Sequence, residues 1–298
     1  MSQHFSILFL VSLLILPVSA SAPEEDFAGG EPKLRRTYWD SVAAGAIRGG
    51  VYVVEHPLVT TMDRVALSGN SPLSILRNLI KGGGMTALWR GGSTIAARAG
   101  SWPFRMGVYQ GVGERVQPGY QRTLCTAGAM TIMDTLLLKP FDTLRIAMVS
   151  ATKEKPFDLK KALSPRALYK DILSVGGGNL YTWAIYLSAD AYFKSLFRSY
   201  SEGQELSVPQ LLGVSAAITL TSGVFCAPAR LVMTTLQAPD APCSGLVNGF
   251  KCAWQSIGRK GFMRHTRLGT IAYLPGNIAA TFLFDWLDRK NSMAQNQH

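Results

Sequence analysis

The sequence predicts an all-α membrane protein in which six transmembrane helices form three pseudo-threefold repeats, with short surface helices in the loops on one side. Three observations lead to this prediction. Of the 298 residues, 47% are hydrophobic and 16% are charged, which favours a large buried or lipid-facing area. A proline stands near the end of three long apolar segments, at Pro57, Pro140 and Pro228. These prolines are 140 − 57 = 83 and 228 − 140 = 88 residues apart, which indicates an internal repeat.

The motif that organises the chain is KPFDTLR, at residues 139–145. Its proline removes a backbone donor and crowds the preceding turn, so a kink is expected where the apolar segment that begins near Leu124 ends. Asp142 and Arg145, three residues apart, share one helix face just after the kink. An acid and a base at the end of an apolar helix indicate a paired site that faces water. Weaker copies of the motif occupy residues 57–62 and 228–233.

The first residues of the chain precede the predicted repeats. Residues 1–22 resemble a secretory signal peptide cleaved after Ala20: residues 5–22 form an apolar run that ends in small residues, although no Lys or Arg precedes this run. A short membrane anchor is the alternative, and the residues do not decide between the two. Residues 23–37 read as a linker without helical periodicity, and residues 291–298 as a polar tail.

The three repeats, 38–118, 119–202 and 203–290, each read as a long helix, a short helix and a second long helix. One such repeat cannot bury its polar face alone, whereas three around an axis enclose a cavity. The expected long helices cover about Tyr38 to Ala66, Gly92 to Val116, Gln121 to Val149, Gly177 to Tyr200, Val208 to Leu236 and Thr266 to Lys290, and the short helices lie near Pro72 to Lys81, within Ala151 to Val175 and near Leu246 to Ile257.

The first long helix carries two further signals. Gly45, Gly49 and Gly50 allow a close contact with another helix. Arg48 and Glu55 lie inside the same helix, where charged side chains should face a cavity or each other rather than lipid.

The chain is basic, with a formal net charge of +11. Its basic residues gather in the loops after the first, third and fifth long helices, whereas the short connections after the second and fourth carry few of them. The positive-inside rule therefore places the long loops on one side of a membrane. The basic excess also fits an anionic solute or an anionic membrane surface. No nucleic-acid-binding signature accompanies it, so no nucleic-acid partner is expected.

The sequence gives no sign of catalysis. The four cysteines and four histidines are scattered without metal-binding spacing, so no metal site is expected. No nucleophile–base–acid set is visible, and the glycine run at residues 176–178 lacks the Lys-Ser/Thr of a phosphate-binding loop. We therefore expect a protein that is not an enzyme and that needs no cofactor.

The repeated motif, together with the glycine-led turn that ends in Trp89-Arg90-Gly91 before the second long helix, resembles the mitochondrial carrier family. The resemblance runs from Tyr38 to Arg289 and indicates a divergent member similar to the nucleotide carriers, including those encoded by intracellular bacteria. It implies a monomer in the mitochondrial inner membrane that contacts the lipid bilayer. The signal-like N-terminus leaves two other locations open: a host mitochondrion reached from an intracellular bacterium, and another membrane reached by secretion.

The resemblance also implies a matrix gate, in which the acid of one repeat's motif pairs with the base of the preceding motif. Only the second copy keeps both groups, Asp142 and Arg145. The first copy offers apolar residues at both positions, and the third has Arg230 at the position of the acid. We therefore expect a matrix gate of Asp142, Arg145 and Arg230, in which Arg145 faces Arg230 and Asp142 bridges the two arginines.

A second gate and a central binding site follow from the same resemblance. The cytoplasmic gate maps onto Tyr109, Gln110, Asp190 and Asp285. Asp190 and Asp285 could accept hydrogen bonds from Lys194 and Arg289. The substrate contacts map onto Arg98, Gly177, Gly178, Ala272 and Tyr273, to which we add Arg48.

Two of these contacts have an alternative reading. Arg98 either binds a phosphate or carboxylate or is paired within the bundle. The glycines form either a wall for a flat base or a flexible helix entry.

The resemblance thus implies a transmembrane carrier that moves a small anionic metabolite, with an adenine nucleotide (ATP or ADP) as the best candidate, by alternating access. The alternative belongs to another class: a carrier-fold protein that has lost transport and acts as a membrane scaffold, receptor or insertase. The incomplete gate motifs favour that alternative.

Overall fold

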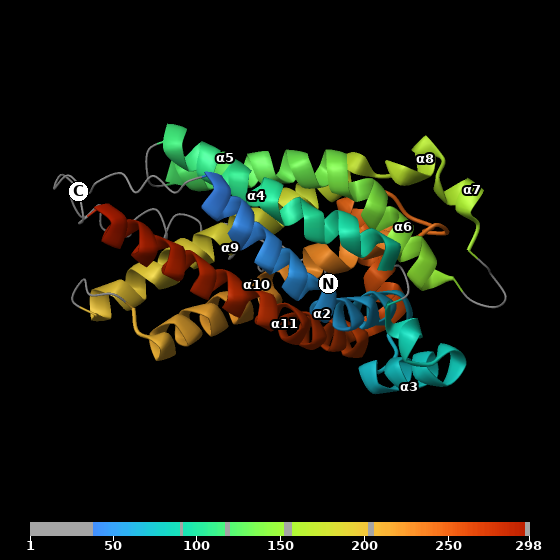
Figure 1. The fold of residues 1–298 in the computed structure, drawn as a ribbon. Helices are drawn as coiled ribbons and strands as arrows, with labels where there is room; N and C mark the ends of the chain where they lie inside the picture. Colours follow the sequence, from blue (N-terminus) through green and yellow to red (C-terminus); the bar gives the residue numbers. More distant parts are fainter. Residues whose placement is uncertain (1–37, 90–91, 117–119, 152–156, 202–205, 296–298) are drawn as a thin grey trace.

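The computed structural model describes residues 38–89, 92–116, 120–151, 157–201 and 206–295. The predicted signal-like segment, the predicted linker and the last three residues of the tail lie outside this part of the chain. Every regular element in the described part is helical (Figure 1), so the all-α class is confirmed.

Long helices alternate with short ones along the chain, close to the predicted positions. The α-helices are α2 (Tyr38–Ser68), α3 (Pro72–Gly83), α4 (Ile95–Arg115), α5 (Tyr120–Met133), α6 (Lys139–Ser150), α7 (Leu159–Ala162), α8 (Pro165–Leu168), α9 (Ile172–Tyr200), α10 (Val208–Gln237) and α11 (Leu246–Gln295). Two 3₁₀ turns, η1 (Met85–Trp89) and η2 (Gly92–Thr94), precede α4, and a π-helical turn, η3 (Asp134–Leu138), joins α5 to α6.

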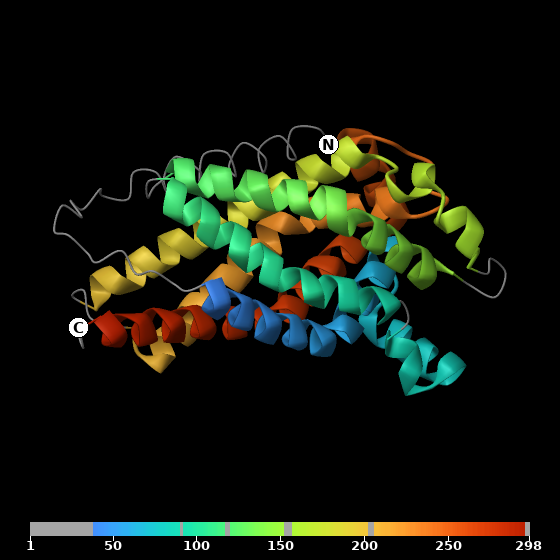
Figure 2. The ribbon, with the colours of Figure 1, turned by 45° about the horizontal axis from the view of Figure 1, so that its top comes forward.

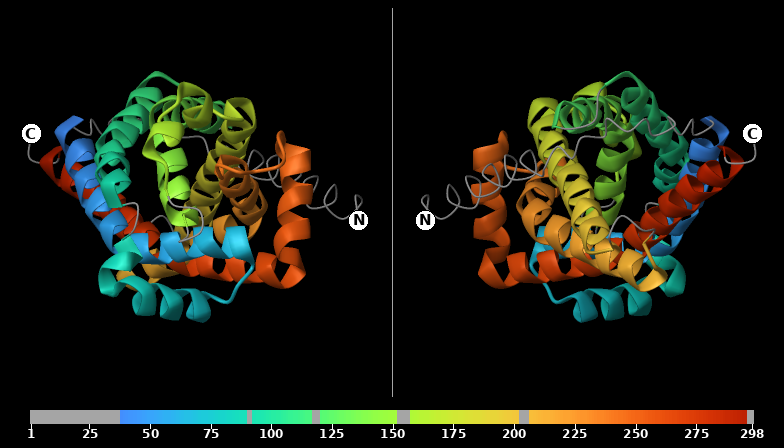
Figure 3. Two further views of the ribbon diagram at one scale, coloured as in Figure 1. Left: turned by 90° about the vertical axis from the view of Figure 1, so that its right-hand side faces the viewer. Right: turned by 90° about the vertical axis from the view of Figure 1, so that its left-hand side faces the viewer.

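The long helices form a closed ring around one axis, which is visible end-on in Figure 3 and from the side in Figure 2. Around the ring α2 packs on α4, α4 on α5, α5 on α9, α9 on α10, α10 on α11, and α11 returns to α2. The short helices lie at one end of the ring. This arrangement brings side chains from every part of the chain toward a common centre.

Three residues with left-handed backbone mark an internal repeat. They are Gly84 (φ 67°), Asp171 (φ 53°) and Gly258 (φ 59°), and each stands between a short helical segment and the long segment that follows. Asp171 lies 171 − 84 = 87 residues after Gly84, and Gly258 lies 258 − 171 = 87 residues after Asp171. A side chain at positive φ is disfavoured, so Asp171 is the costly member of this set. The constant spacing supports three repeats, whereas the first and last residue of each repeat stay a prediction.

Two glycines explain how closely α2 approaches α4. A methyl group added at Gly45 would lie 2.5 Å from Cα of Pro103, and one at Gly49 would lie 2.4 Å from the carbonyl oxygen of Ala99. A methyl group at Gly50 would meet nothing within 4 Å. The predicted close contact is therefore confirmed for Gly45 and Gly49, whereas Gly50 faces open space.

The expected kink at Pro140 takes the form of the π-helical turn η3. Because Pro140 has no N–H group, it cannot bond the carbonyl of Leu136. The hydroxyl of Tyr169 donates to that carbonyl instead, at 3.2 Å. Such turns occur often at functional sites, and here the turn places Asp134 and Lys139 at its two ends.

The bundle is polar inside and partly apolar outside. Buried charged side chains include Arg48, Glu55, Asp63, Arg105 and Arg145. Exposed apolar side chains occur on the long helices and on η3, among them Val54, Phe104, Leu137, Leu173, Leu220 and Ile271. Because of the buried charged side chains, the mean hydropathy of a whole long helix is lower than that of its exposed face.

The predicted six membrane-spanning helices need correction. Within the described residues one helix, α10, is long and apolar enough to cross a membrane, and half of its most apolar window is buried inside the protein. The other long helices contain charged residues that reduce their mean hydropathy; α2, for example, carries Arg48, Glu55 and Asp63 in its interior. The prediction of a six-span bundle was therefore wrong: the apolar segments were long enough, but the charged inward faces were given too little weight.

Candidate functional site

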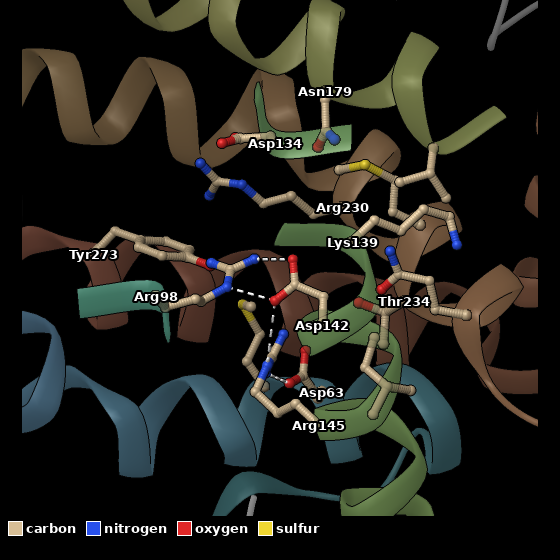
Figure 4. Close-up of a pocket in the computed structure, with 15 residues that line it drawn as sticks. Asp63, Arg98, Asp134, Lys139, Asp142, Arg145, Asn179, Arg230, Thr234 and Tyr273 are labelled. Carbon is tan, nitrogen blue, oxygen red and sulfur yellow. Dashed lines mark hydrogen bonds and ion pairs between the residues drawn. The ribbon is translucent and has the colours of Figure 1, made fainter. Parts of the chain in front are cut away.

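A polar pocket of about 70 Å³ lies at the centre of the ring, and side chains from six of its helical segments line it (Figure 4). The lining comes from α2, α4, η3 with α6, α9, α10 and α11. Its charged members are Asp63, Arg98, Asp134, Lys139, Asp142, Arg145 and Arg230, and its polar members are Asn179, Thr234, Gln237 and Tyr273. Hydrogen-bonding side chains thus predominate in the lining, and its apolar members are Met62, Ile146, Val175 and Met233.

An alternating chain of charges crosses the pocket wall. Arg98 on α4 binds Asp142 on α6 with two nitrogens, Nε to Oδ1 and Nη2 to Oδ2, each at 2.5 Å. Arg145, one turn after Asp142, donates to Asp63 on α2 and lies 3.9 Å from Asp142. These four side chains join three helices through charge-assisted hydrogen bonds (Figure 4).

A second ion pair stands beside the first. Arg105 on α4 donates to Asp134 at 2.9 Å, and the indole nitrogen of Trp183 on α9 donates to the other oxygen of Asp134, also at 2.9 Å. Asp134 comes from the π-helical turn before Pro140. The kink therefore supplies a carboxylate that holds α4 and α9 together at this level of the ring.

Two cations of the pocket have no carboxylate partner among the described residues. The amine of Lys139, which is 1% exposed, donates to the carbonyl of Leu168 at 3.1 Å. The guanidinium carbon of Arg230 lies 4.3 Å from the ring centre of Tyr273. In Figure 4 no dashed line joins Arg230 to any of the residues drawn.

The pocket is therefore positively charged. Four bases line it, Arg98, Lys139, Arg145 and Arg230, against three acids, Asp63, Asp134 and Asp142. A surplus cation in a buried site has a large desolvation cost unless an anion compensates it. This surplus is the feature of the pocket that points to a ligand.

Burial and neighbouring charges act on these groups in opposite directions. Burial raises the pKa of Asp142, but Arg98 and Arg145 lower it more strongly, so the net shift is below the ordinary value and the carboxylate stays charged. Burial lowers the pKa of Lys139 to about 8, against the attraction of Asp171 and Asp142. The charge of Lys139 is thus the pocket charge most easily changed near neutral pH.

The three residues of the expected matrix gate have other partners than those predicted from the sequence. Asp142, Arg145 and Arg230 all line the pocket, but Arg145 is paired with Asp63 rather than facing Arg230. Asp142 does not bridge two arginines of the repeated motif, because its main partner is Arg98. Asp63 directly follows Met62, the residue at the expected base position, and this one-residue offset concealed it.

Some of the expected substrate contacts line the pocket and others do not. Arg98 and Tyr273 line the pocket, but Arg98 already has its partner in Asp142. Of the two glycines, Gly178 is packed against Met233 and Gly177 faces Leu246 at the outside, so neither lines the pocket.

Two further expected contacts also lie away from the pocket. Ala272 is buried in an apolar cluster with Val59 and Leu268. Arg48 binds Glu55 at 3.0 Å, and Glu55 in turn accepts from the backbone of Gly276 at 2.8 Å. The prediction that Arg48 and Glu55 face each other is confirmed, and this pair joins α2 to α11.

The expected cytoplasmic gate can be followed in part. Asp190 accepts from Lys194 at 2.9 Å, as predicted. Tyr109 packs in an apolar cluster near Trp183, and Arg122 lies over its ring at 6.0 Å. The side chains of Gln110 and Asp285 lie outside the described part of the chain.

Asp63, Asp134 and Lys139 were missed as site residues from the sequence. Each is a charged residue inside an apolar segment, and such residues line cavities as a rule. That signal was applied to Arg48 and Glu55 and would have found these three as well.

The fold and site together define an all-α protein with a central, positively charged pocket. Comparison with known proteins adds no family: no family model matches the chain, and no curated protein matches it. The resemblance to the mitochondrial carriers therefore stays a prediction.

Proposed function

We propose that this protein is a carrier for a small anionic solute, which binds in the central pocket. The observation that carries the proposal is the charge of the pocket, where four bases meet three acids in a partly buried site. An anion there would offset the surplus charge and accept charge-assisted hydrogen bonds. A neutral or cationic solute would leave the surplus uncompensated.

The size of the pocket bears on which anion is bound. About 70 Å³ corresponds to roughly five water molecules. Sites for drug-sized ligands usually measure about 300–1,000 Å³. The described conformation therefore fits an anion the size of phosphate or a small carboxylate. An adenine nucleotide, the candidate from the family resemblance, requires a more open conformation, and alternating access would have to provide it.

The outer surface favours a lipid bilayer as the partner of the long helices. Large apolar side chains such as Val54 and Leu173 are 73% and 87% exposed on that surface. Apolar groups exposed in this number on several helices usually mark a contact with lipid or protein. The proposal requires contact with lipid and makes no claim of six membrane-spanning helices. The mitochondrial inner membrane is the location that the family resemblance favours.

A second candidate function is favoured by the first copy of the motif. Val59 and Met62, which replace its charged residues, are 1% and 3% exposed in an apolar cluster. A gate needs groups that can separate and solvate, and these two motif positions supply none, although Asp63 beside them pairs with Arg145. A carrier-fold protein that acts as a scaffold, receptor or insertase would tolerate such a permanently closed contact.

Purified protein in lipid vesicles separates the two candidates. Equilibrium binding of radiolabelled phosphate, succinate and ADP is measured first, followed by uptake of each solute into the vesicles. We expect saturable binding of at least one anion, no binding of glucose, and uptake of the anion that binds. Binding without uptake would favour the second candidate. Absence of binding for all three anions would contradict the proposed anion site.

A further inference from the structure

We propose that Arg230, whose guanidinium lies over the ring of Tyr273, is the group that binds the oxyanion of the solute. This inference rests on the proposed function and deepens it, because it assigns the solute contact to a residue that the repeated motif places in a gate. The ligand class is a small oxyanion, phosphate or carboxylate, bound through two guanidinium N–H groups.

The first argument compares the arginines at the centre of the ring. Arg98 is held by Asp142, Arg145 by Asp63 and Arg105 by Asp134. Each of these arginines has its charge neutralised by a carboxylate within hydrogen-bonding distance.

Arg230 differs from all three. Among the described residues, its partner is the aromatic ring of Tyr273, whose centre lies 4.3 Å from the guanidinium carbon. An aromatic ring attracts a cation at its face but accepts no hydrogen bond from the edge of the guanidinium. The N–H groups on that edge therefore stay available for a ligand.

The second argument is geometric. The guanidinium carbon of Arg230 lies over the ring of Tyr273, 4.3 Å from its centre, so the ring limits the movement of the guanidinium before a ligand binds. Oxyanions with two oxygens in one plane, such as carboxylate and phosphate, match the spacing of two adjacent N–H groups. Arg230 and Tyr273 both line the pocket, so the guanidinium N–H groups that the ring leaves unbonded lie beside it.

The third argument concerns the neighbours. Asn179, Thr234 and Gln237 line the same pocket as Arg230, and Thr234 and Gln237 are each 6% exposed. Amide and hydroxyl groups can donate further hydrogen bonds to a bound oxyanion without adding charge. The pocket therefore combines two cations that lack a carboxylate partner among the described residues, Arg230 and Lys139, with neutral donors, which is the composition expected of an oxyanion site.

Arg98, the residue favoured from the sequence, is the less suitable contact. Its charge is already compensated by two bonds to Asp142 at 2.5 Å, and a ligand that took over these two donors would displace the carboxylate. That exchange leaves Asp142 without its main partner, and a buried unpaired carboxylate is costly. Arg230 can bind an oxyanion without breaking any ion pair that the structure contains.

The test measures phosphate affinity in purified full-length protein, in lipid vesicles, for five variants, one of which is Lys139→Gln. Arg230→Gln removes the charge and should weaken phosphate binding by about tenfold or more, while Arg230→Lys keeps the charge without the fork of donors and should recover part of the loss. Tyr273→Leu should weaken binding by a smaller factor because the guanidinium is no longer held. Arg259→Gln removes one exposed positive charge and should leave the affinity unchanged.

Succinate and ADP, measured on the same variants, show which oxyanion the site prefers. A loss for all three ligands in Arg230→Gln supports a shared oxyanion contact, and a loss for phosphate alone supports a phosphate-sized site. Melting curves check that each variant is folded. If Arg230→Gln does not fold, the affinity of Arg230→Lys still tests the contact.

Two results would overturn the inference, and they differ in what else they contradict. Wild-type affinity in Arg230→Gln, with weakened affinity in Lys139→Gln, would move the contact away from Arg230 and leave the proposed anion pocket intact. Absence of anion binding in the wild-type protein would contradict the inference and the proposed function together.

Discussion

The guanidinium of Arg145 binds the carboxylate of Asp63, and this ion pair joins α6 to α2 beside the central pocket. Both side chains are almost fully buried, at 6% and 1% exposure. A buried ion pair adds little stability compared with apolar residues of the same size, but the loss of one partner leaves the other charged and unsolvated. The pair therefore acts mainly by fixing which helix faces which.

The first prediction concerns this pair. Asp63→Asn should lower the free energy of unfolding by about 3 to 5 kcal/mol, because Arg145 loses its main acid partner in a buried position. Thermal denaturation in the same lipid or detergent measures the change. Asp240→Asn is the matched control, since Asp240 faces Lys161 at 3.9 Å in a pair that is 61% and 70% exposed. A change in the control of more than about 0.5 kcal/mol would be unexpected for such a pair. Equal stability of wild type and Asp63→Asn would contradict the assigned ion pair.

The second prediction uses two neighbouring glycines of α2. Gly49→Ala should destabilise the protein, because the new methyl group would lie 2.4 Å from the backbone oxygen of Ala99 and push α2 away from α4. Gly50→Ala should leave stability unchanged or raise it by roughly 0.5 to 1 kcal/mol, since its methyl group meets nothing within 4 Å and alanine favours the helix. Melting temperatures of the two variants check the prediction. Equal destabilisation of Gly49→Ala and Gly50→Ala would contradict the assigned contact between Gly49 and α4.

The third prediction concerns pH. Because the pKa of Lys139 is lowered to about 8, its amine is charged below pH 8 and neutral well above it. Sulfate, whose charge is constant from pH 6.5 to 9.5, should therefore bind more weakly as the pH rises through this range, by roughly threefold or more. The charges that face Lys139 are those of Asp142, Asp171 and Lys170.

Lys139→Gln is the control for this experiment. The variant should bind sulfate more weakly than wild type at low pH and show little change with pH. A pH profile in the variant as steep as that of the wild-type protein would assign the titration to another group.

Much of the fold could be predicted from the sequence because its signals are local. Proline and glycine positions, apolar length and loop composition predicted most helix ends to within five residues, including a kink near Pro140. The predicted start of the last long helix at Thr266 was wrong, because α11 runs from Leu246 to Gln295 and its backbone departs from helical geometry at Gly258. The repeat also has a local cause, since left-handed backbone at Gly84 and Gly258 marks the turns after the short helices.

The pairing of charges could not be predicted in the same way. Arg145 and Asp63 are 82 residues apart, and Arg98 and Asp142 are 44 apart, so their contacts depend on how the helices pack. The family pattern paired charges by motif position, and it failed where Asp63 stands one place beyond that position. The membrane prediction failed for a related reason, because inward-facing charges reduce the hydropathy of helices whose outer faces are apolar.

The measurement that tests the central claim most directly is the position of a bound anion in a crystal of the protein soaked with selenate. The selenium atom gives an anomalous signal that locates the oxyanion without assumptions about the site. We predict a peak in the central pocket within hydrogen-bonding distance of the guanidinium of Arg230, and its loss in crystals of Arg230→Gln. Peaks confined to the protein surface at saturating selenate, with an empty central pocket, would contradict the account.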